Sequence, residues 1–132
     1  MTDVVAALIT KDGKFLIGQR PAHKARGLLW EFVGGKIEKG ESPQQALRRE
    51  VWEELGVMIQ VGDIFQQVTH TYEDITVRLT LYWATISEGE PQKREHEALC
   101  WVTASEMAQY PFCPADQPIL EKLASLTEEK AR

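Results

Sequence analysis

The chain has little of what marks secreted, membrane-bound or nucleic-acid-binding proteins. Its two cysteines, Cys100 and Cys113, stand apart and form no C-x-x-C pair. They predict reduced thiols in a cytoplasmic protein, with a bridge between them left open. No apolar run approaches the roughly 20 residues of a membrane span, and the first residues lack the basic and apolar regions of a signal peptide. A formal net charge of −5 argues against a nucleic-acid polymer or an anionic membrane as partner.

Histidine is also scarce. The three histidines, His23, His70 and His96, lie far apart without the spacing of a metal site. His96 follows Glu95, so it is expected either to tune that carboxylate or to be an exposed loop side chain. Repeats, low-complexity segments and linkers are absent from the sequence, which predicts one domain over residues 1–132, long enough to bury a core.

The most informative feature that is present is the stretch from Gly35 to Val57. It reads G-x5-E-x7-R-E-U-x-E-E-x-G-U, where U is an aliphatic residue. Seven positions are fixed in type, so a chance match at any one start is on the order of 10⁻⁸. A pattern this specific indicates a functional motif.

Residues 43–55 of this stretch are predicted to form a helix. Ser42 and Gln45 make an S-x-x-Q capping box, and Pro43 suits the first helical position. Gly56 suits a left-handed stop at the other end. One apolar stripe recurs every four residues and should face the core: Leu47, Val51 and Leu55.

Three carboxylates share one face of the predicted helix, since Glu50, Glu53 and Glu54 fall at i, i+3 and i+4. Arg49 can pair with Glu53, so a solvated, salt-bridged surface is one interpretation. Three carboxylates within one turn repel each other unless a cation lies among them, and such oxygen clusters suit Mg²⁺ or Mn²⁺. The glycine pair at 34–35 is expected to form a loop whose backbone can approach a metal or a phosphate. The second interpretation is therefore a cradle for metal ions and a polyphosphate.

The remaining hydrophobic patterns predict a mixed sheet. Strands are expected at residues 4–10, 14–19, 30–33, 64–71, 75–86 and 99–102, and further helices at 104–109 and 117–126. The last helix should bury one face: Ile119, Leu120, Leu123 and Leu126. Strands mixed with a few helices in this order predict an α/β (α+β) fold in which a mixed β-sheet is sandwiched between α-helices.

The motif of residues 35–57 is the Nudix box, and the chain resembles the Nudix hydrolases over nearly its whole length. It is most similar to the MutT-like branch in five local strings: residues 19–20, 30–32, 35–38, 88–91 and 114–119. The resemblance implies the Nudix α/β/α sandwich. It also implies Mg²⁺-dependent hydrolysis, with Mn²⁺ as a substitute, of a free nucleoside triphosphate to the monophosphate and pyrophosphate. The substrate would be of the 8-oxo-dGTP or the CTP and 5-methyl-dCTP class, and the enzyme a monomer or homodimer.

The resemblance implies five metal-binding positions: Gly34 through its carbonyl, Glu50, Glu53, Glu54 and Glu95. Either Glu50 or Glu95 would be the general base. Arg49 is expected to orient a motif carboxylate, with a plain pair to Glu53 as the alternative. Glu41 is expected to brace the loop.

Five residues are expected to contact the substrate: Arg20, Phe32, Lys36, Tyr72 and Asp116. Arg20 and Lys36 either reach the substrate or are surface residues. Phe32 and Tyr72 either stack on the base or pack in the core. Asp116 stands where MutT carries asparagine. An ionised carboxylate only accepts, which suits the N4 amine of cytosine, whereas a protonated one could read an oxidised guanine; the alternative role of Asp116 is a helix cap.

Two other functions remain open on the sequence. One is a Nudix hydrolase for ADP-ribose or a dinucleoside polyphosphate, against which the MutT-like ending around Asp116 argues. The other is a nucleotide-binding module without catalysis, against which the intact motif argues.

Overall fold

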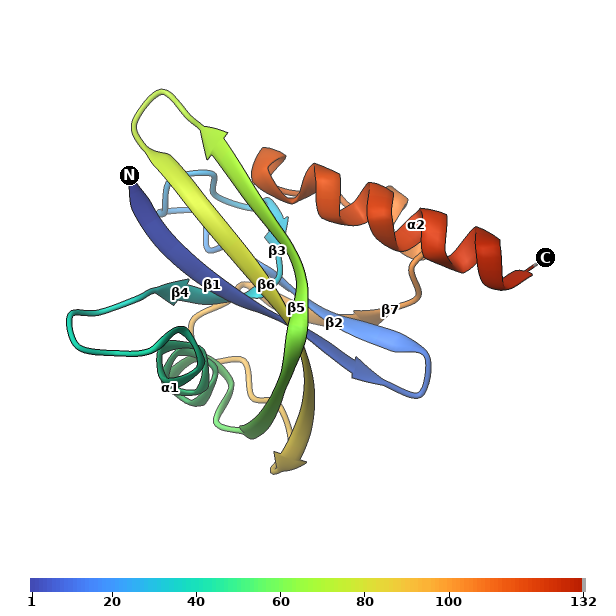
Figure 1. The fold of residues 1–132 in the computed structure, drawn as a ribbon, viewed down its shortest axis with the longest axis horizontal. Helices are drawn as coiled ribbons and strands as arrows, with labels where there is room; N and C mark the ends of the chain where they lie inside the picture. The colour runs from blue at the N-terminus through green and yellow to red at the C-terminus, as the bar shows by residue number, and fades with distance from the viewer. Residues whose placement is uncertain (132) are drawn as a thin grey trace.

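A mixed sheet with one helix on each side forms the fold (Figure 1). The computed structural model describes residues 1–131, and side chains as far as residue 126. Its elements are β1 (Thr2–Lys11), β2 (Lys14–Gln19), β3 (Trp30–Glu31), β4 (Val33–Lys36), α1 (Pro43–Leu55), β5 (Met58–Thr71), β6 (Thr76–Glu88), β7 (Ala98–Val102), two 3₁₀ turns (Glu106–Gln109 and Pro114–Asp116) and α2 (Gln117–Ala131). Within the described part of the chain, neither helix is long and apolar enough to cross a membrane.

The strands follow the order β3-β2-β1-β6-β5, with β4 paired to β1 and β7 paired to β2. The β1–β6 pair is parallel and the other pairs are antiparallel. The predicted mixed sheet between helices is thereby confirmed. The glycine pair does not form the loop expected from sequence: Gly34 and Gly35 belong to β4, opposite Ala6 and Val5 of β1.

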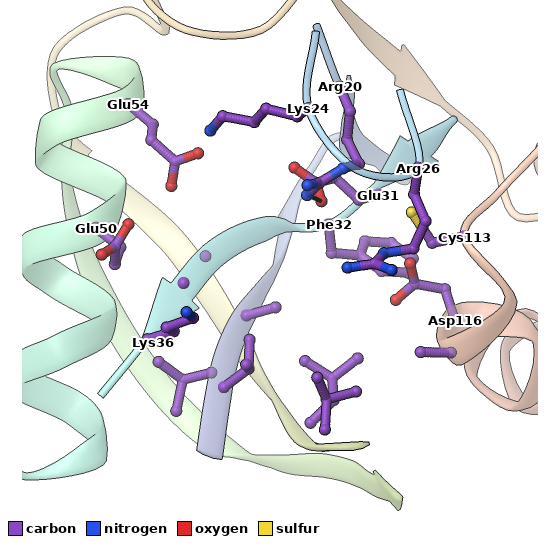
Figure 2. Close-up of a pocket in the computed structure, with 18 of the residues that line it drawn as sticks. Arg20, Lys24, Arg26, Glu31, Phe32, Lys36, Glu50, Glu54, Cys113 and Asp116 are labelled. Carbon is purple, nitrogen blue, oxygen red and sulfur yellow. Dashed lines mark hydrogen bonds and ion pairs between the residues drawn. The ribbon is translucent and has the colours of Figure 1, made fainter. Parts of the chain in front are cut away.

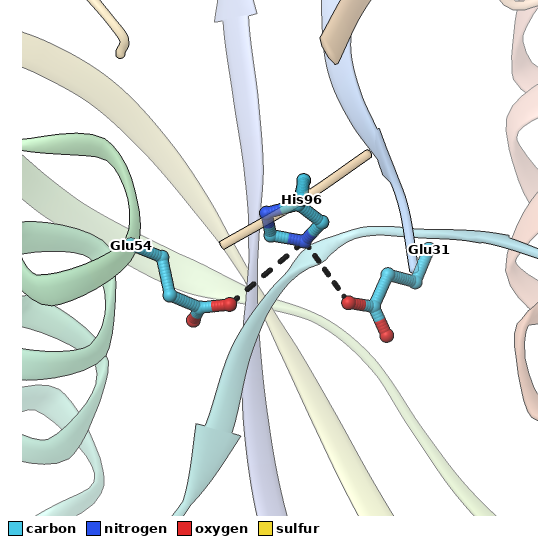
Figure 3. A group of neighbouring side chains, drawn as sticks. All are labelled: Glu31, Glu54 and His96. Carbon is cyan, nitrogen blue, oxygen red and sulfur yellow. Dashed lines mark hydrogen bonds and ion pairs between the residues drawn. The ribbon is translucent and has the colours of Figure 1, made fainter. Parts of the chain in front are cut away.

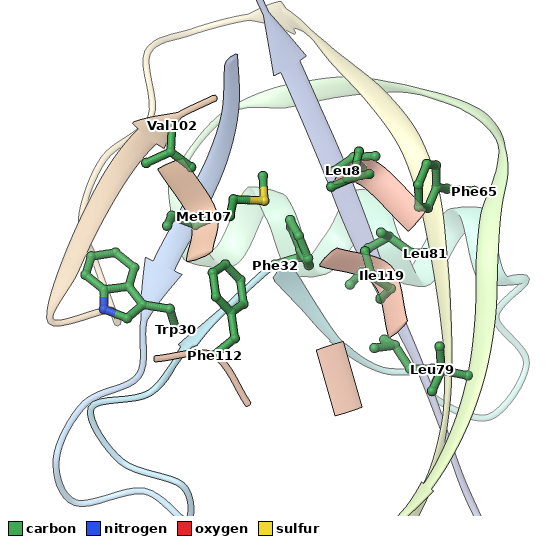
Figure 4. Close-up of a cluster of buried hydrophobic side chains, with 14 residues drawn as sticks. Leu8, Trp30, Phe32, Phe65, Leu79, Leu81, Val102, Met107, Phe112 and Ile119 are labelled. Atoms are coloured by element: carbon green, nitrogen blue, oxygen red, sulfur yellow. The ribbon is translucent and has the colours of Figure 1, made fainter. Parts of the chain in front are cut away.

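Alternation along the central strands divides the core in two. Under α1, β1 contributes Val5, Ala7 and Ile9, which pack with the apolar stripe of the helix. On the opposite face, Ala6 and Leu8 pack with α2 and a set of aromatic rings (Figure 4). Both faces of the sheet are therefore buried, one under α1 and the other under α2.

Helix α1 forms as the sequence predicts. Ser42 and Gln45 make the reciprocal capping box, and Gly56 ends the helix with φ 68°. The stripe is fully buried: Leu47, Val51 and Leu55.

Three other predictions need correction. The helix expected at 104–109 is a short 3₁₀ turn, since the residue before Pro111 is extended, at φ −109° and ψ 135°. Strand β5 starts at Met58 rather than residue 64, and bulges interrupt its early pairing with β6. Leu126 was expected to be buried but is 37% exposed, because the C-terminal part of α2 extends beyond the sheet (Figure 1).

The capping box can be tested by substitution. We expect Ser42→Ala to lower the free energy of unfolding by about 1 kcal/mol, because the Gln45 backbone N–H loses its acceptor. Urea denaturation measures this. Ser125→Ala, on an exposed turn of α2, is the control and should cause no loss. Equal effects of the two substitutions would contradict the cap.

Candidate active site

A cavity of about 670 Å³ opens between α1 and the segment that leads into α2 (Figure 2). All ten residues predicted for metal and substrate line it: Arg20, Phe32, Gly34, Lys36, Glu50, Glu53, Glu54, Tyr72, Glu95 and Asp116. Arg49, which was expected to orient a motif carboxylate, is not among the lining residues. The cavity has two ends, with α1 carboxylates at one and Asp116 at the other.

Glycine is required where α1 meets β4. A Cβ built on Gly35 would lie 2.4 Å from Cδ of Glu50, and a Cβ built on Gly34 would lie 1.9 Å from the carbonyl oxygen of Val5. Gly34 thus allows β4 to pair with β1, and Gly35 allows the Glu50 carboxylate to rest on the backbone. The close approach that the structure shows is to Glu50 and to β1, and the predicted approach to a metal or a phosphate stays a prediction.

Arg49 holds the outer side of this contact. Its Nη1 donates to Oε1 of Glu50 at 2.7 Å, and its Nε and Nη2 bind both oxygens of Glu41 at 2.7 and 2.9 Å. Nη1 also donates to Glu53, at a longer 3.3 Å. The hydrogen bond from Arg49 and a second from the Glu38 backbone lower the pKa of Glu41 to about 2. Arg49 therefore contacts Glu53, as the sequence allows, and makes its shorter contact with a second motif carboxylate, Glu50.

The expectation that His96 is an exposed loop side chain was wrong, and its effect on Glu95 stays a prediction. His96 is buried, at 6% exposure, and donates from Nε2 to Oε2 of Glu31 at 3.1 Å, with Oε1 of Glu54 at 3.8 Å (Figure 3). Gly18 makes room, because a Cβ there would come within 2.6 Å of the imidazole ring. Glu31 had no predicted role; the signal that could have found it is a carboxylate between two large aromatics in a strand.

Glu54 carries the strongest electrostatic perturbation at this end. It is 6% exposed, and its Oε2 has no hydrogen-bond partner among the described residues. Burial, followed by repulsion from Glu31, Glu50 and Glu95, raises its pKa to about 9. A buried carboxylate with a free oxygen among other carboxylates fits a hard divalent cation, which would relieve the repulsion.

The group of neighbouring side chains that could hold a metal ion differs from the predicted set. In the described part of the chain it comprises Glu31, Glu54 and His96, whose ligand atoms lie within 4.8 Å of one another. The Glu53 side chain lines the cavity but is 53% exposed. The structure therefore adds Glu31 and His96 to the carboxylates that could hold a cation.

The other end of the cavity surrounds Asp116, which is 4% exposed. Burial and the nearby Glu31 raise its pKa, while Arg20 opposes them. Asp116 is the last residue of the 3₁₀ turn Pro114–Asp116, directly before α2, so its alternative role as a helix cap stays a prediction. The Tyr72 hydroxyl accepts from the Ala115 backbone N–H at 3.0 Å and fixes this wall.

Lining residues without a predicted role include Lys24, Arg26 and Cys113. Arg26 places its Cζ 4.2 Å from the centroid of the Tyr72 ring, so it covers one face of the ring expected to stack on a base. Arg20 binds Glu31 at 2.8 Å and the Ala25 carbonyl at 2.9 Å, which makes it a brace for the loop that carries these cations.

A family model described as NUDIX domain matches residues 4–122. The chain belongs to the Nudix family. It is 43% identical over 126 residues to the CTP pyrophosphohydrolase of Escherichia coli, covering 96% of this chain and 93% of that one. It is 38% identical over 125 residues to a Mycobacterium tuberculosis protein named "Putative 8-oxo-dGTP diphosphatase 2", covering 92% and 86%. The MutT protein from Methanosarcina mazei superposes with a TM-score of 0.84 at 25% identity, covering 96% and 94%.

Membership in the Nudix family accounts for the layout of the cavity. The chain is a Nudix hydrolase of MutT type, and its motif helix is α1. The predictions of family, fold and enzyme class are confirmed. The roles of the individual residues remain predictions.

The raised pKa of Glu54 predicts a pH dependence of stability without metal. Its folded pKa of about 9 lies above the ordinary 4.5, so the stability it contributes is complete below 4.5 and is lost as pH rises through 9. In chelator, we expect unfolding free energy to fall more steeply between about pH 6 and pH 9 for the wild type than for Glu54→Gln. Urea titrations measure both slopes. Saturating Mg²⁺ should reduce the difference, and equal slopes in chelator would contradict the burial argument.

Proposed function

We propose that the protein is a Mg²⁺-dependent pyrophosphohydrolase that cleaves a free nucleoside triphosphate to the monophosphate and pyrophosphate. The observation that carries this proposal is the two-ended cavity. Carboxylates of α1 lie at one end, and Asp116 and Phe32 lie at the other, where the Tyr72 hydroxyl binds the backbone of Ala115. This arrangement suits a ligand with a polyphosphate at one end and a base at the other.

The carboxylate end is suited to the reacting phosphates. Glu50, Glu53, Glu54 and Glu95, joined by Glu31 and His96, would hold the cation. When bound, the cation neutralises phosphate charge and lowers the pKa of water. The 2.7 Å hydrogen bond from Arg49 holds the Glu50 carboxylate in one orientation. Lys36 lines the carboxylate end of the cavity, where its ammonium suits a phosphate oxygen. Glu50 and Glu95 are the two candidates for the base that takes the proton of the attacking water.

The nucleoside end is suited to a base that both donates and accepts. With its pKa raised by burial, Asp116 in the protonated form offers one O–H donor and one acceptor. Cytosine presents the matching pair at N3 and N4, and guanine presents it at O6 and N1. The two curated relatives are named for a cytidine and an oxidised guanine nucleotide, and both classes fit this reading of Asp116.

The described site is built from a single chain, so we propose that activity needs no second subunit. A monomer and a homodimer would both present it. Both cysteines are free thiols, which suits the cytoplasm, where free nucleotides and Mg²⁺ are found.

Pyrophosphate release tests the reaction. We expect turnover of at least one nucleoside triphosphate with Mg²⁺, and Glu53→Gln should lower it by at least about 10²-fold, because one charge at the phosphate end is lost. Glu121→Gln, on an exposed part of α2, is the matched control and should keep full activity. Absence of release from every triphosphate would contradict the proposal. Turnover of ADP-ribose or a dinucleoside polyphosphate instead, or binding without turnover, would favour one of the two other functions.

The role of Asp116 is tested by kcat/KM for dCTP, 5-methyl-dCTP, CTP, dGTP and 8-oxo-dGTP, in the wild type and in Asp116→Asn. The amide keeps a donor and an acceptor but cannot ionise. We expect the ranking of the five nucleotides to change, with each altered base contact worth about tenfold. An unchanged ranking, with unchanged stability, would reject base recognition by this residue.

A further inference from the structure

The loop between β2 and β3 brings a second arginine to the nucleoside end of the cavity. Two backbone hydrogen bonds of Arg20 close this loop. The Arg20 N–H donates to the Leu29 carbonyl, and the Arg20 carbonyl accepts from the Leu28 N–H, each at 2.9 Å. The Arg20 Nε also donates to the Ala25 carbonyl at 2.9 Å. Arg26, held within this loop, has φ 58°, a left-handed conformation that a non-glycine residue rarely adopts. These contacts direct the Arg26 side chain toward the cavity that it lines.

Two contacts anchor the Arg26 guanidinium. Nη1 lies 3.0 Å from Oδ1 of Asp74, on the turn between β5 and β6, and Cζ lies over the ring of Tyr72. The side chain is 23% exposed, so it is packed against these partners rather than extended into solvent. Since Asp74 takes one of the five N–H groups of the guanidinium, donors remain for a ligand.

Arg26 belongs to the nucleoside end and not to the phosphate end. Its guanidinium lies over the ring of Tyr72, whose hydroxyl accepts from the backbone N–H of Ala115, the residue before Asp116. Figure 2 shows Arg26 and Asp116 across the cavity from Glu50 and Glu54. A ligand whose phosphates lie among the α1 carboxylates would place its base between Arg26 and Asp116. The guanidinium covers the Tyr72 ring, so it takes the position that a stacked base would otherwise occupy on that face.

The chemistry of a guanidinium restricts what it can recognise. It offers donors only, in a fork that fits two neighbouring acceptors. Guanine presents such a pair at O6 and N7, and cytosine presents one at N3 and O2. Adenine and uracil place a donor or a C–H group between their acceptors. Oxidation of guanine at C8 puts a hydrogen on N7 and removes the pair from that base.

We infer that Arg26 is a specificity-determining residue that selects nucleobases with two neighbouring acceptors, namely guanine or cytosine. Asp74 is its positioning residue, because it holds the guanidinium from outside the cavity. The inference rests on the proposed function for the direction in which the nucleotide binds. It also predicts that Arg26 disfavours 8-oxoguanine relative to guanine.

The test is kcat/KM for dGTP, dCTP, dATP, dTTP and 8-oxo-dGTP in Arg26→Gln, with Kd values for non-hydrolysable analogues of the same nucleotides. We expect Arg26→Gln to lower kcat/KM for dGTP or dCTP by about tenfold or more relative to dATP and dTTP. The ratio of 8-oxo-dGTP to dGTP should rise. The separate dGTP and dCTP arms show which acceptor pair is used. Asp74→Asn should move the same ratios in the same direction by a smaller factor.

The matched control is Arg48→Gln, which removes the same charge from an exposed position on α1 and should leave every ratio unchanged. An equal loss for all bases would overturn the inference and assign Arg26 to the phosphates. Unchanged ratios would overturn it as well. If the wild type cleaves no triphosphate, the proposed function fails, and the Kd ratios of the analogues still decide for or against Arg26.

Discussion

The close approach of α1 to β4 is the contact on which the geometry of the cavity depends. Gly34 allows β4 to pair with β1, and Gly35 leaves room for the Glu50 carboxylate against the backbone. The buried stripe of α1 then fixes how the helix is rotated, and with it the direction of every carboxylate on the opposite face. A single methyl group at either glycine would force the helix or the strand to move.

This packing places charge where the fold would be more stable without it. Glu54 is buried with one unsatisfied oxygen, and Glu31, Glu50 and Glu95 all repel its ionised form. The ionised form of such a buried carboxylate lowers the stability of the metal-free chain, and a bound cation would raise it again. The opposite end shows the same conflict, since Asp116 is buried near Glu31 and only partly compensated by Arg20. At both ends of the cavity, side chains that suit ligand binding therefore lower the stability of the folded chain.

The parts of the site that could be predicted from sequence are those encoded locally. The spacing within α1 places its carboxylates on one face, and capping box and glycine stop define its ends. The contacts of His96 could not be predicted, because Glu31 and Glu54 are 65 and 42 positions away in the chain and meet it only through the order of the strands. The contacts of Arg26 could not be predicted for the same reason. Its partners Tyr72 and Asp74 lie in the turn between β5 and β6, at the opposite edge of the sheet from β3.

By itself the sequence determined the family, the class of bond that is broken, the alternation of the strands and the length and polarity of α1, because each depends on residue types at short, fixed spacing. Tertiary structure alone decided which side chains share the cavity. It buried His96 between two carboxylates, turned a predicted glycine loop into a paired strand, and set Arg26 over the ring of Tyr72. Those outcomes depend on strand order and on loops that meet across the sheet, and periodicity along one segment carries no information about either.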